Sequence, residues 1–112
     1  MIKLYRGDVI EVYYIDSKKG LKKRPVIVFQ NPPKKSIDTI SVYCTSQNDG
    51  DDDNVIFIES DSEEGRNMGL TKDTYIRPLI IRPIDSKFFV RKIGKCSLMQ
   101  EIQKIVDRRM AS

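Results

Sequence analysis

Residues 39–46, with the sequence TISVYCTS, show the clearest secondary-structure pattern in the chain. Apolar and polar side chains alternate along this stretch, which is typical of a β-strand with one buried face. The apolar face would carry Ile40, Val42 and Cys44, and the opposite, polar face would carry Ser41, Tyr43 and Thr45. The segment therefore predicts a sheet, and the sequence on either side supplies further strands.

Five other segments also have the composition of strands, because they are rich in β-branched and aromatic residues and are bounded by turn residues. They are residues 9–15, 26–29, 55–59, 74–84 and 88–96. Arg24-Pro25 would open the second of these, since proline is tolerated at the start of a strand. Pro78 and Pro83 predict an edge position or a bulge within 74–84, and Gly94 predicts a kink.

One helix is expected at the end of the chain. Ser97 and Gln100 fit a capping box, and Leu98, Ile102, Ile105 and Val106 form an apolar stripe that would dock on the sheet. A partner-binding helix remains the alternative reading of this stripe. Residues 48–54 and the acidic stretch around Gly65 and Gly69 are expected to be exposed, mobile loops. Six short strands and a helix predict a mainly β, strongly bent small barrel, with residues 1–112 forming a single domain.

The charge is unevenly distributed along the 112 residues. Eight of the sixteen acids lie between Asp49 and Glu64, which contains no base, so the rest of the chain carries twenty bases against eight acids. This excess predicts a polyanionic partner. The bases gather on both sides of residues 26–29, in expected loops that contain Lys18, Lys19, Lys22, Lys23 and Arg24 before them and Lys34 and Lys35 after them. An ordinary solvated charge run is the alternative.

Several classes of chemistry lack support. The chain has no histidine, which removes the commonest general acid–base residue and metal ligand, and it has no glycine-rich phosphate loop. Cys44 and Cys96 are expected to be reduced thiols in the core. Residues 51–53 offer carboxylates to Mg²⁺, but a flexible acidic run is usually solvated. We therefore expect no metal and no cofactor. With no signal sequence or apolar run of membrane-spanning length, we expect a cytoplasmic protein.

RNA cleavage is compatible with this composition, because RNA supplies its own nucleophile, the 2′-hydroxyl. The enzyme must align that oxygen and stabilise the negative charge that develops on the phosphate. A guanidinium and a hydroxyl suit this task. Arg24 and Thr45 are candidates, since each is expected at a strand end facing the polar side. The alternatives are an ordinary loop arginine and a threonine that merely favours a strand.

Short motifs throughout the chain resemble the MazF/PemK toxins of bacterial toxin–antitoxin pairs in their order and spacing. They are Arg6-Gly7-Asp8-Val9, Arg24-Pro25-Val26, Thr45-Ser46-Gln47, Gly69-Leu70 with Asp73, Ile81-Arg82 with Ile84-Asp85, and Lys92-Ile93-Gly94-Lys95. The chain differs from the family at the loop before Arg24, which is lysine-rich here, and at Leu79 and Ile80, where family members tend to carry polar residues.

The resemblance implies an SH3-like barrel (CcdB/PemK-like) that forms a homodimer. It implies a sequence-specific endoribonuclease that cuts single-stranded RNA (mRNA) without a metal and leaves a 2′,3′-cyclic phosphate and a 5′-hydroxyl. In this reading Arg24 and Thr45 are the catalytic pair, and a cognate antitoxin inhibits with an acidic, partly disordered tail. The RNA-binding residues would be Lys18, Lys19, Lys22, Lys23, Tyr43, Ser46 and Gln47.

Two other functions remain open. A barrel of this kind could bind RNA or DNA without cutting it, with Tyr43 stacking a base. Alternatively, it could act on a protein, since related barrels are directed at DNA gyrase. Fold alone does not choose among these three.

Overall fold

The computed structural model describes residues 3–16, 18, 20–30, 38–47 and 54–111. They form six strands, two α-helices and one 3-10 turn. In chain order these are β1 (Asp8–Asp16), β2 (Gly20–Gln30), β3 (Asp38–Thr45), β4 (Ile56–Ile58), α1 (Glu63–Asn67), β5 (Thr74–Asp85), η1 (Ser86–Phe88), β6 (Phe89–Lys95) and α2 (Met99–Ala111).

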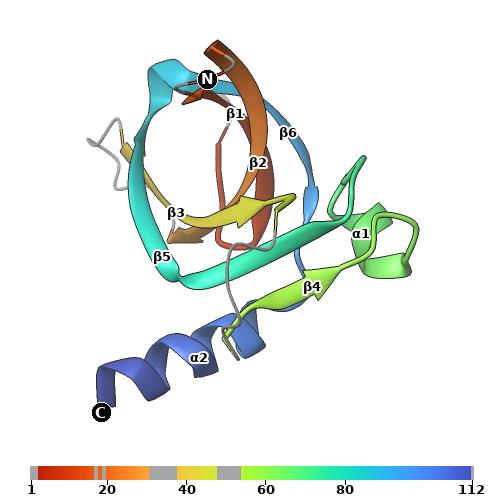
Figure 1. Ribbon diagram of the computed structural model, residues 1–112. Helices are drawn as coiled ribbons and strands as arrows, with labels where there is room; N and C mark the ends of the chain where they lie inside the picture. Colours follow the sequence, from red (N-terminus) through yellow and green to blue (C-terminus); the bar gives the residue numbers. More distant parts are fainter. Residues whose placement is uncertain (1–2, 17, 19, 31–37, 48–53, 112) are drawn as a thin grey trace.

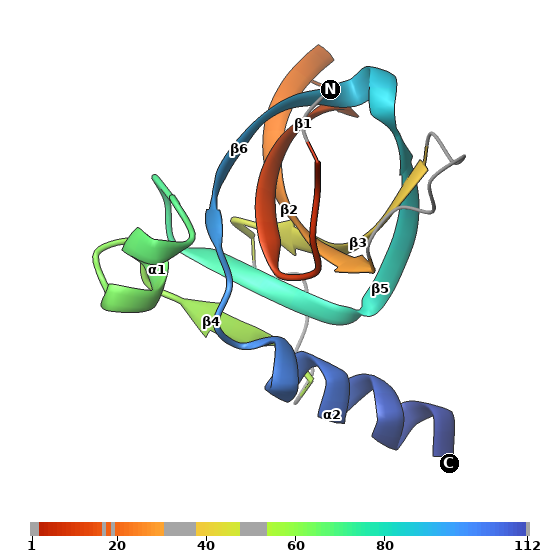
Figure 2. The same cartoon turned by 180° about the vertical axis from the view of Figure 1, so that it is seen from behind.

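The strands form one antiparallel sheet in the order β4-β5-β3-β2-β1-β6. The sheet curls round on itself, while α2 lies outside it at one end and α1 lies at the side near β6 (Figures 1 and 2). This arrangement confirms the predicted bent barrel with a carboxy-terminal helix. All six strands were predicted within a few residues, apart from the start of β2.

The β1–β2 hairpin is longer than predicted. Eight residue pairs join the two strands without a break, from Val9 opposite Ile27 to Asp16 opposite Gly20. The expected basic loop over residues 18–23 is therefore wrong, since β2 begins at Gly20. Arg24-Pro25 lies inside the strand instead of opening it, and pairing with β3 starts one residue later, at Val26. The prediction failed because Tyr13 and Tyr14 of β1 pair with Lys23 and Lys22, and a run of lysines resembles a loop when it is read in isolation.

The prolines of β5 occupy the two settings predicted for them. Between Val42 opposite Ile81 and Tyr43 opposite Arg77 the register shifts, so Pro78 and its two successors have no partner on β3. Pro78 therefore sits in a wide bulge that bends the strand. Pro83 pairs with Ile40 on one side, and no described strand pairs with it on the other, because β4 reaches only residues 74–76.

The acidic stretch after β4 is not a loop, as had been expected, but contains the short helix α1. The side-chain oxygen of Ser62 accepts a hydrogen bond from the Gly65 backbone N–H at 3.0 Å, and Glu63 and Glu64 occupy the first turn, where acids favour a helix. Residues 48–53 of the other expected loop lie outside the described residues, as do Lys34 and Lys35.

Helix α2 docks on the sheet through the predicted stripe. Ile102 is fully buried in the main core with Val9, Ile27 and Ile76, and Leu98 packs against them. The expected capping box is wrong. The Leu98 carbonyl accepts the first helical bond, from Ile102, and the Ser97 hydroxyl bonds to the Glu64 carboxylate. The tertiary contact with α1 thus replaces the local cap. Among the described residues, no helix is long and apolar enough to cross a membrane.

The predicted kink at Gly94 coincides with a close approach of two backbones. A Cβ at this position would overlap backbone atoms of Asn67 and Met68 at the end of α1. The register with β1 also shifts here, between Val9 and Ile10. Glycine lets β6 pass directly under α1.

We expect Gly94→Ala to lower the free energy of unfolding by about 2–3 kcal/mol, because backbone must move to admit the methyl group. Urea denaturation measures the change. Gly20→Ala is the control, since a Cβ there meets nothing within 4 Å although φ is +77°, and it should cost about 1 kcal/mol. Equal losses for the two variants would contradict the overlap.

Both cysteines lie in the main core, as predicted. Burial raises the pKa of each thiol above its ordinary value.

We expect a thiol-specific disulfide reagent at pH 8 to modify neither cysteine in the native protein and both cysteines after unfolding. Only the thiolate reacts, and burial disfavours the thiolate. A fast-reacting native thiol would show that this part of the core opens.

Candidate functional site

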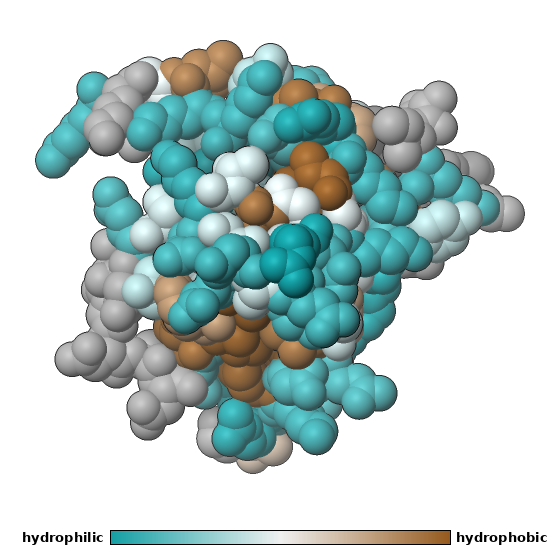
Figure 3. Space-filling view, turned by 90° about the vertical axis from the view of Figure 1, so that its right-hand side faces the viewer, coloured by the Kyte–Doolittle hydropathy of each residue, from teal (hydrophilic) through white to brown (hydrophobic). Residues whose placement is uncertain are grey.

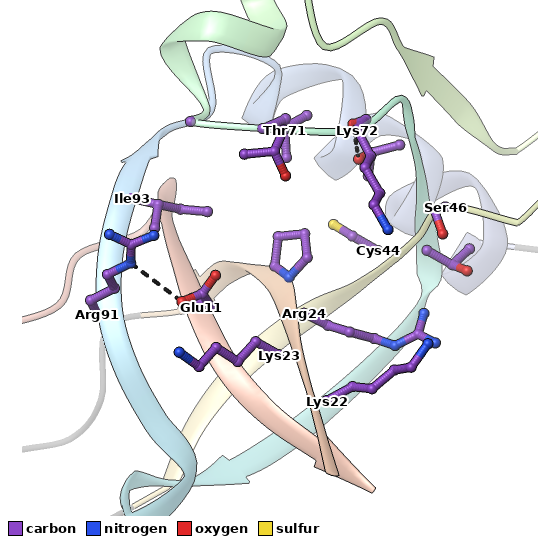
Figure 4. Close-up of a pocket in the computed structure, with 15 residues that line it drawn as sticks. Glu11, Lys22, Lys23, Arg24, Cys44, Ser46, Thr71, Lys72, Arg91 and Ile93 are labelled. Carbon is purple, nitrogen blue, oxygen red and sulfur yellow. Dashed lines mark hydrogen bonds and ion pairs between the residues drawn. The ribbon is translucent and has the colours of Figure 1, made fainter. Parts of the chain in front are cut away.

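A pocket of about 180 Å³ opens where β2, the end of β3, the loop before β5 and β6 meet (Figure 4). Arg24 and Thr45, which are far apart in sequence, both line it, together with Glu11, Lys22, Lys23, Pro25, Cys44, Ser46, Gly69, Leu70, Thr71, Lys72, Thr74, Arg91 and Ile93. The structure therefore brings the two predicted catalytic residues to one cavity.

Arg24 reaches the pocket from within β2. It is opposite Val12 of β1, and its guanidinium lies over the ring of Tyr14, 5.0 Å from the centroid. A cation over an aromatic face is attracted by the ring quadrupole. The ring and the pairing with β1 therefore hold the guanidinium at the pocket, although Arg24 is not at a strand end as expected.

Thr45 is the last residue of β3 and is 4% exposed. Its Oγ1 accepts a hydrogen bond from the Gln47 backbone N–H at 3.1 Å. Because this bond uses a lone pair of the oxygen, the hydroxyl proton stays available for donation. Gln47 thus belongs to the turn that orients Thr45, while Ser46 lines the pocket directly.

The wall opposite β2 comes from the loop before β5. The Thr74 hydroxyl donates to the Lys72 carbonyl at 2.9 Å, and the Asp73 carboxylate accepts the Ser60 backbone N–H at 2.9 Å. These bonds fix the turn that carries Lys72, whose side chain points into the pocket (Figure 4). Lys72 was not predicted as a site residue, since nothing in its local sequence separates it from other exposed lysines.

The pocket is strongly cationic. Five of its lining residues are bases, namely Lys22, Lys23, Arg24, Lys72 and Arg91, and Glu11 is the one acid among the described lining residues. Glu11 is ion-paired with Arg91, with 3.3 Å between Oε1 and Nε. Figure 3 shows one face of the molecule, on which hydrophilic side chains predominate and hydrophobic side chains form smaller patches among them. Such a cavity suits a phosphate or a carboxylate.

The other predicted binding residues lie elsewhere. Tyr43 lines a second, more apolar pocket of about 340 Å³ that shares Arg24 with the first. Lys18 is exposed near the hairpin tip and does not line the first pocket, and Lys19 lies outside the described residues. Lys22 and Lys23 do line the first pocket, but from a strand and not from the loop that had been expected.

Among the described residues that line the pocket there is one thiol, which is buried, and there is no cluster of metal-ligating side chains. Cys44 lines it, but its side chain is 1% exposed and burial raises its thiol pKa, so that it is a poor nucleophile at neutral pH. The described residues contain no group of three or more histidine, cysteine or acidic side chains placed to hold a metal ion. The acidic residues 51–53 lie outside the described part.

Comparisons with known proteins identify the fold and the family of the chain. The chain has the fold of an endoribonuclease from a mycobacterial species, solved in complex with its cognate antitoxin, with a TM-score of 0.66 and 16% sequence identity over 96% of this chain and 95% of that one. A search of curated protein sequences found no match. Residues 5–111 match the family model of PemK-like, MazF-like toxins of type II toxin–antitoxin systems. The chain therefore belongs to the PemK-like, MazF-like toxin family.

Proposed function

We propose that the protein is an endoribonuclease toxin that cuts single-stranded RNA without a metal, through Arg24 and Thr45. The observation that carries the proposal is that these two residues line one cationic pocket. The fold shared with an endoribonuclease supports the same reaction class. A guanidinium and a hydroxyl donor can both stabilise the negative charge that develops on the phosphate in a metal-free transfer to an internal nucleophile.

In the proposed reaction, the RNA 2′-oxygen forms a bond to phosphorus and the bond from phosphorus to the 5′-oxygen breaks. The products are a 2′,3′-cyclic phosphate and a 5′-hydroxyl. The proton lost by the 2′-oxygen is matched by the proton gained by the 5′-oxygen, so no cofactor is consumed. Arg24 neutralises the phosphorane, and the Thr45 hydroxyl donates to another phosphate oxygen.

The electrostatics of the pocket also suggest the inhibitor. A carboxylate-rich segment presents the same charge as RNA and would compete for Lys22, Lys23 and Lys72. We propose that a cognate antitoxin inactivates the enzyme with such a segment, as an acidic chain that orders on binding.

We also propose that the active form is a cytoplasmic homodimer. Size-exclusion chromatography with light scattering tests the dimer, since a monomer at micromolar concentration would contradict it.

Arg24→Ala and Thr45→Val should each reduce kcat for cleavage of single-stranded RNA by about 10²–10³-fold, since each removes one donor to the developing charge. The wild-type enzyme should stay fully active in EDTA. Product analysis by mass spectrometry should find cyclic phosphate ends.

The controls for these variants are Thr39→Val, a buried threonine on the same strand, and Arg108→Ala, an exposed arginine on α2. Both should cut normally. Intact RNA with the wild-type enzyme would refute the proposal, and RNA binding without cleavage would favour a non-catalytic module. Loss of activity in EDTA with rescue by Mg²⁺ would show a metal mechanism.

Replacing Lys22 and Lys23 by glutamine should weaken RNA binding and reduce the slope of log K against log salt concentration by about 1.4, because two phosphate contacts to a single strand are lost. Fluorescence anisotropy with non-cleavable 2′-fluoro RNA measures this slope. Lys95 and Lys104, exposed and outside the pocket, provide a matched double substitution that should leave the slope unchanged. Equal effects of both double variants would indicate non-specific attraction only.

A further inference from the structure

The pocket contains one pair of side chains that phosphate binding does not explain. Glu11 on β1 and Arg91 on β6 are directly opposite residues, and Arg91 Nε donates to Glu11 Oε1 at 3.3 Å. Both line the pocket that contains Arg24 and Thr45. Figure 4 shows the pair on one side of the pocket, whereas Ser46 and Lys72 lie on the other.

A carboxylate is out of place among phosphate-binding groups. It repels phosphate, and it does so more strongly where protein replaces water. Glu11 is also largely shielded, with its side chain 20% exposed, while Arg91 is 68% exposed. A ligand group that approaches this pair must therefore offer a hydrogen-bond donor to the carboxylate as well as an acceptor to the guanidinium. Phosphates offer only acceptors, whereas nucleobases offer both.

The hydrogen bond between Glu11 and Arg91 does not involve all of their acceptor and donor atoms. It engages Nε and Oε1, so Oε2 can accept from a ligand and the two Nη groups can donate to it. Bases present donor and acceptor in two opposite orders on their Watson–Crick edges. Adenine and cytosine place an amino donor beside a ring-nitrogen acceptor, whereas guanine and uracil place a keto acceptor beside a ring N–H donor. An acceptor–donor pair that faces the exocyclic group at purine C6 or pyrimidine C4 and the adjacent ring nitrogen matches, in one orientation, only one of these orders.

We propose that Glu11 and Arg91 read one base next to the cleaved phosphate and separate amino bases from keto bases there. The place of the pair supports this role, because Glu11 is opposite Pro25, the residue after Arg24. Pro25 and Ile93 add apolar surface to the same pocket, against which a base can pack. The inference rests on the proposed ribonuclease function and adds a specificity determinant to it.

The exchange Glu11→Arg with Arg91→Glu provides the test. It keeps an ion pair and the net charge but reverses the order of donor and acceptor. Cleavage of a randomised single-stranded RNA pool, read by sequencing the new 5′-hydroxyl ends, gives the base preference at each position around the cut. We expect wild-type enzyme to favour one class at one flanking position by about tenfold, the lower range for a bidentate base contact, and the exchanged variant to favour the other class.

Glu11→Gln provides a second variant in case the exchange destabilises the fold. It should lose most of the discrimination, while Arg108→Gln, a charge change outside the pocket, should keep the wild-type preference. If the exchanged variant and Glu11→Gln both retain that preference, or if wild-type enzyme shows no amino–keto preference, the pair is a structural cross-strand contact and the inference is wrong.

Binding separates this inference from the proposed function. Anisotropy with two pools of non-cleavable 2′-fluoro RNA, one of adenine and cytosine and one of guanine and uracil, measures discrimination without cleavage. If wild-type protein cuts no RNA but discriminates between the pools and the exchange reverses the order, the proposed nuclease fails and the base-reading role stands. Equal binding of both pools by both proteins refutes base reading whether or not RNA is cut.

Discussion

The unbroken register between β1 and β2 is the constraint on which the rest of the structure depends. Eight residue pairs join the two strands, from Val9 opposite Ile27 in the core to Asp16 opposite Gly20 at the hairpin tip. A shift by one residue would turn every side chain of β2 to the other face of the sheet. Buried Ile27 and Val28 would then be misplaced, so core packing holds Arg24 beside Tyr14 at the pocket.

The barrel joins groups that are remote in sequence because the sheet is strongly bent. The bulge after Arg77 bends β5, and Gly94 lets β6 pass under α1. These two features bring the loop that carries Lys72 and the Glu11–Arg91 pair to the cavity formed by β2 and β3. The pocket therefore has walls from both halves of the chain, and its cationic character arises from bases that are distributed along the sequence.

The two threonines of the pocket show how similar residues take different roles. Both Thr45 and Thr74 are 4% exposed, yet Thr45 accepts a bond from Gln47 while Thr74 donates its proton to Lys72. Thr45 therefore keeps a proton for a ligand, and Thr74 uses its own to shape the loop. This difference supports Thr45 as the donor in the proposed mechanism, and it could not be deduced from residue type.

The sequence by itself determined the strands, the terminal helix, the buried cysteines and the family, because periodicity and short motifs are local properties. It also pointed to Arg24 and Thr45, which the tertiary structure brings to one pocket. Only the tertiary structure decided that residues 20–23 are strand, that α1 exists, and that Ser97 bonds to Glu64 in place of a helix cap. The tertiary structure also shows that Lys72 and the Glu11–Arg91 pair line the pocket. These features depend on strand pairing and side-chain contacts between segments that are distant in the sequence, so a local sequence pattern does not predict them.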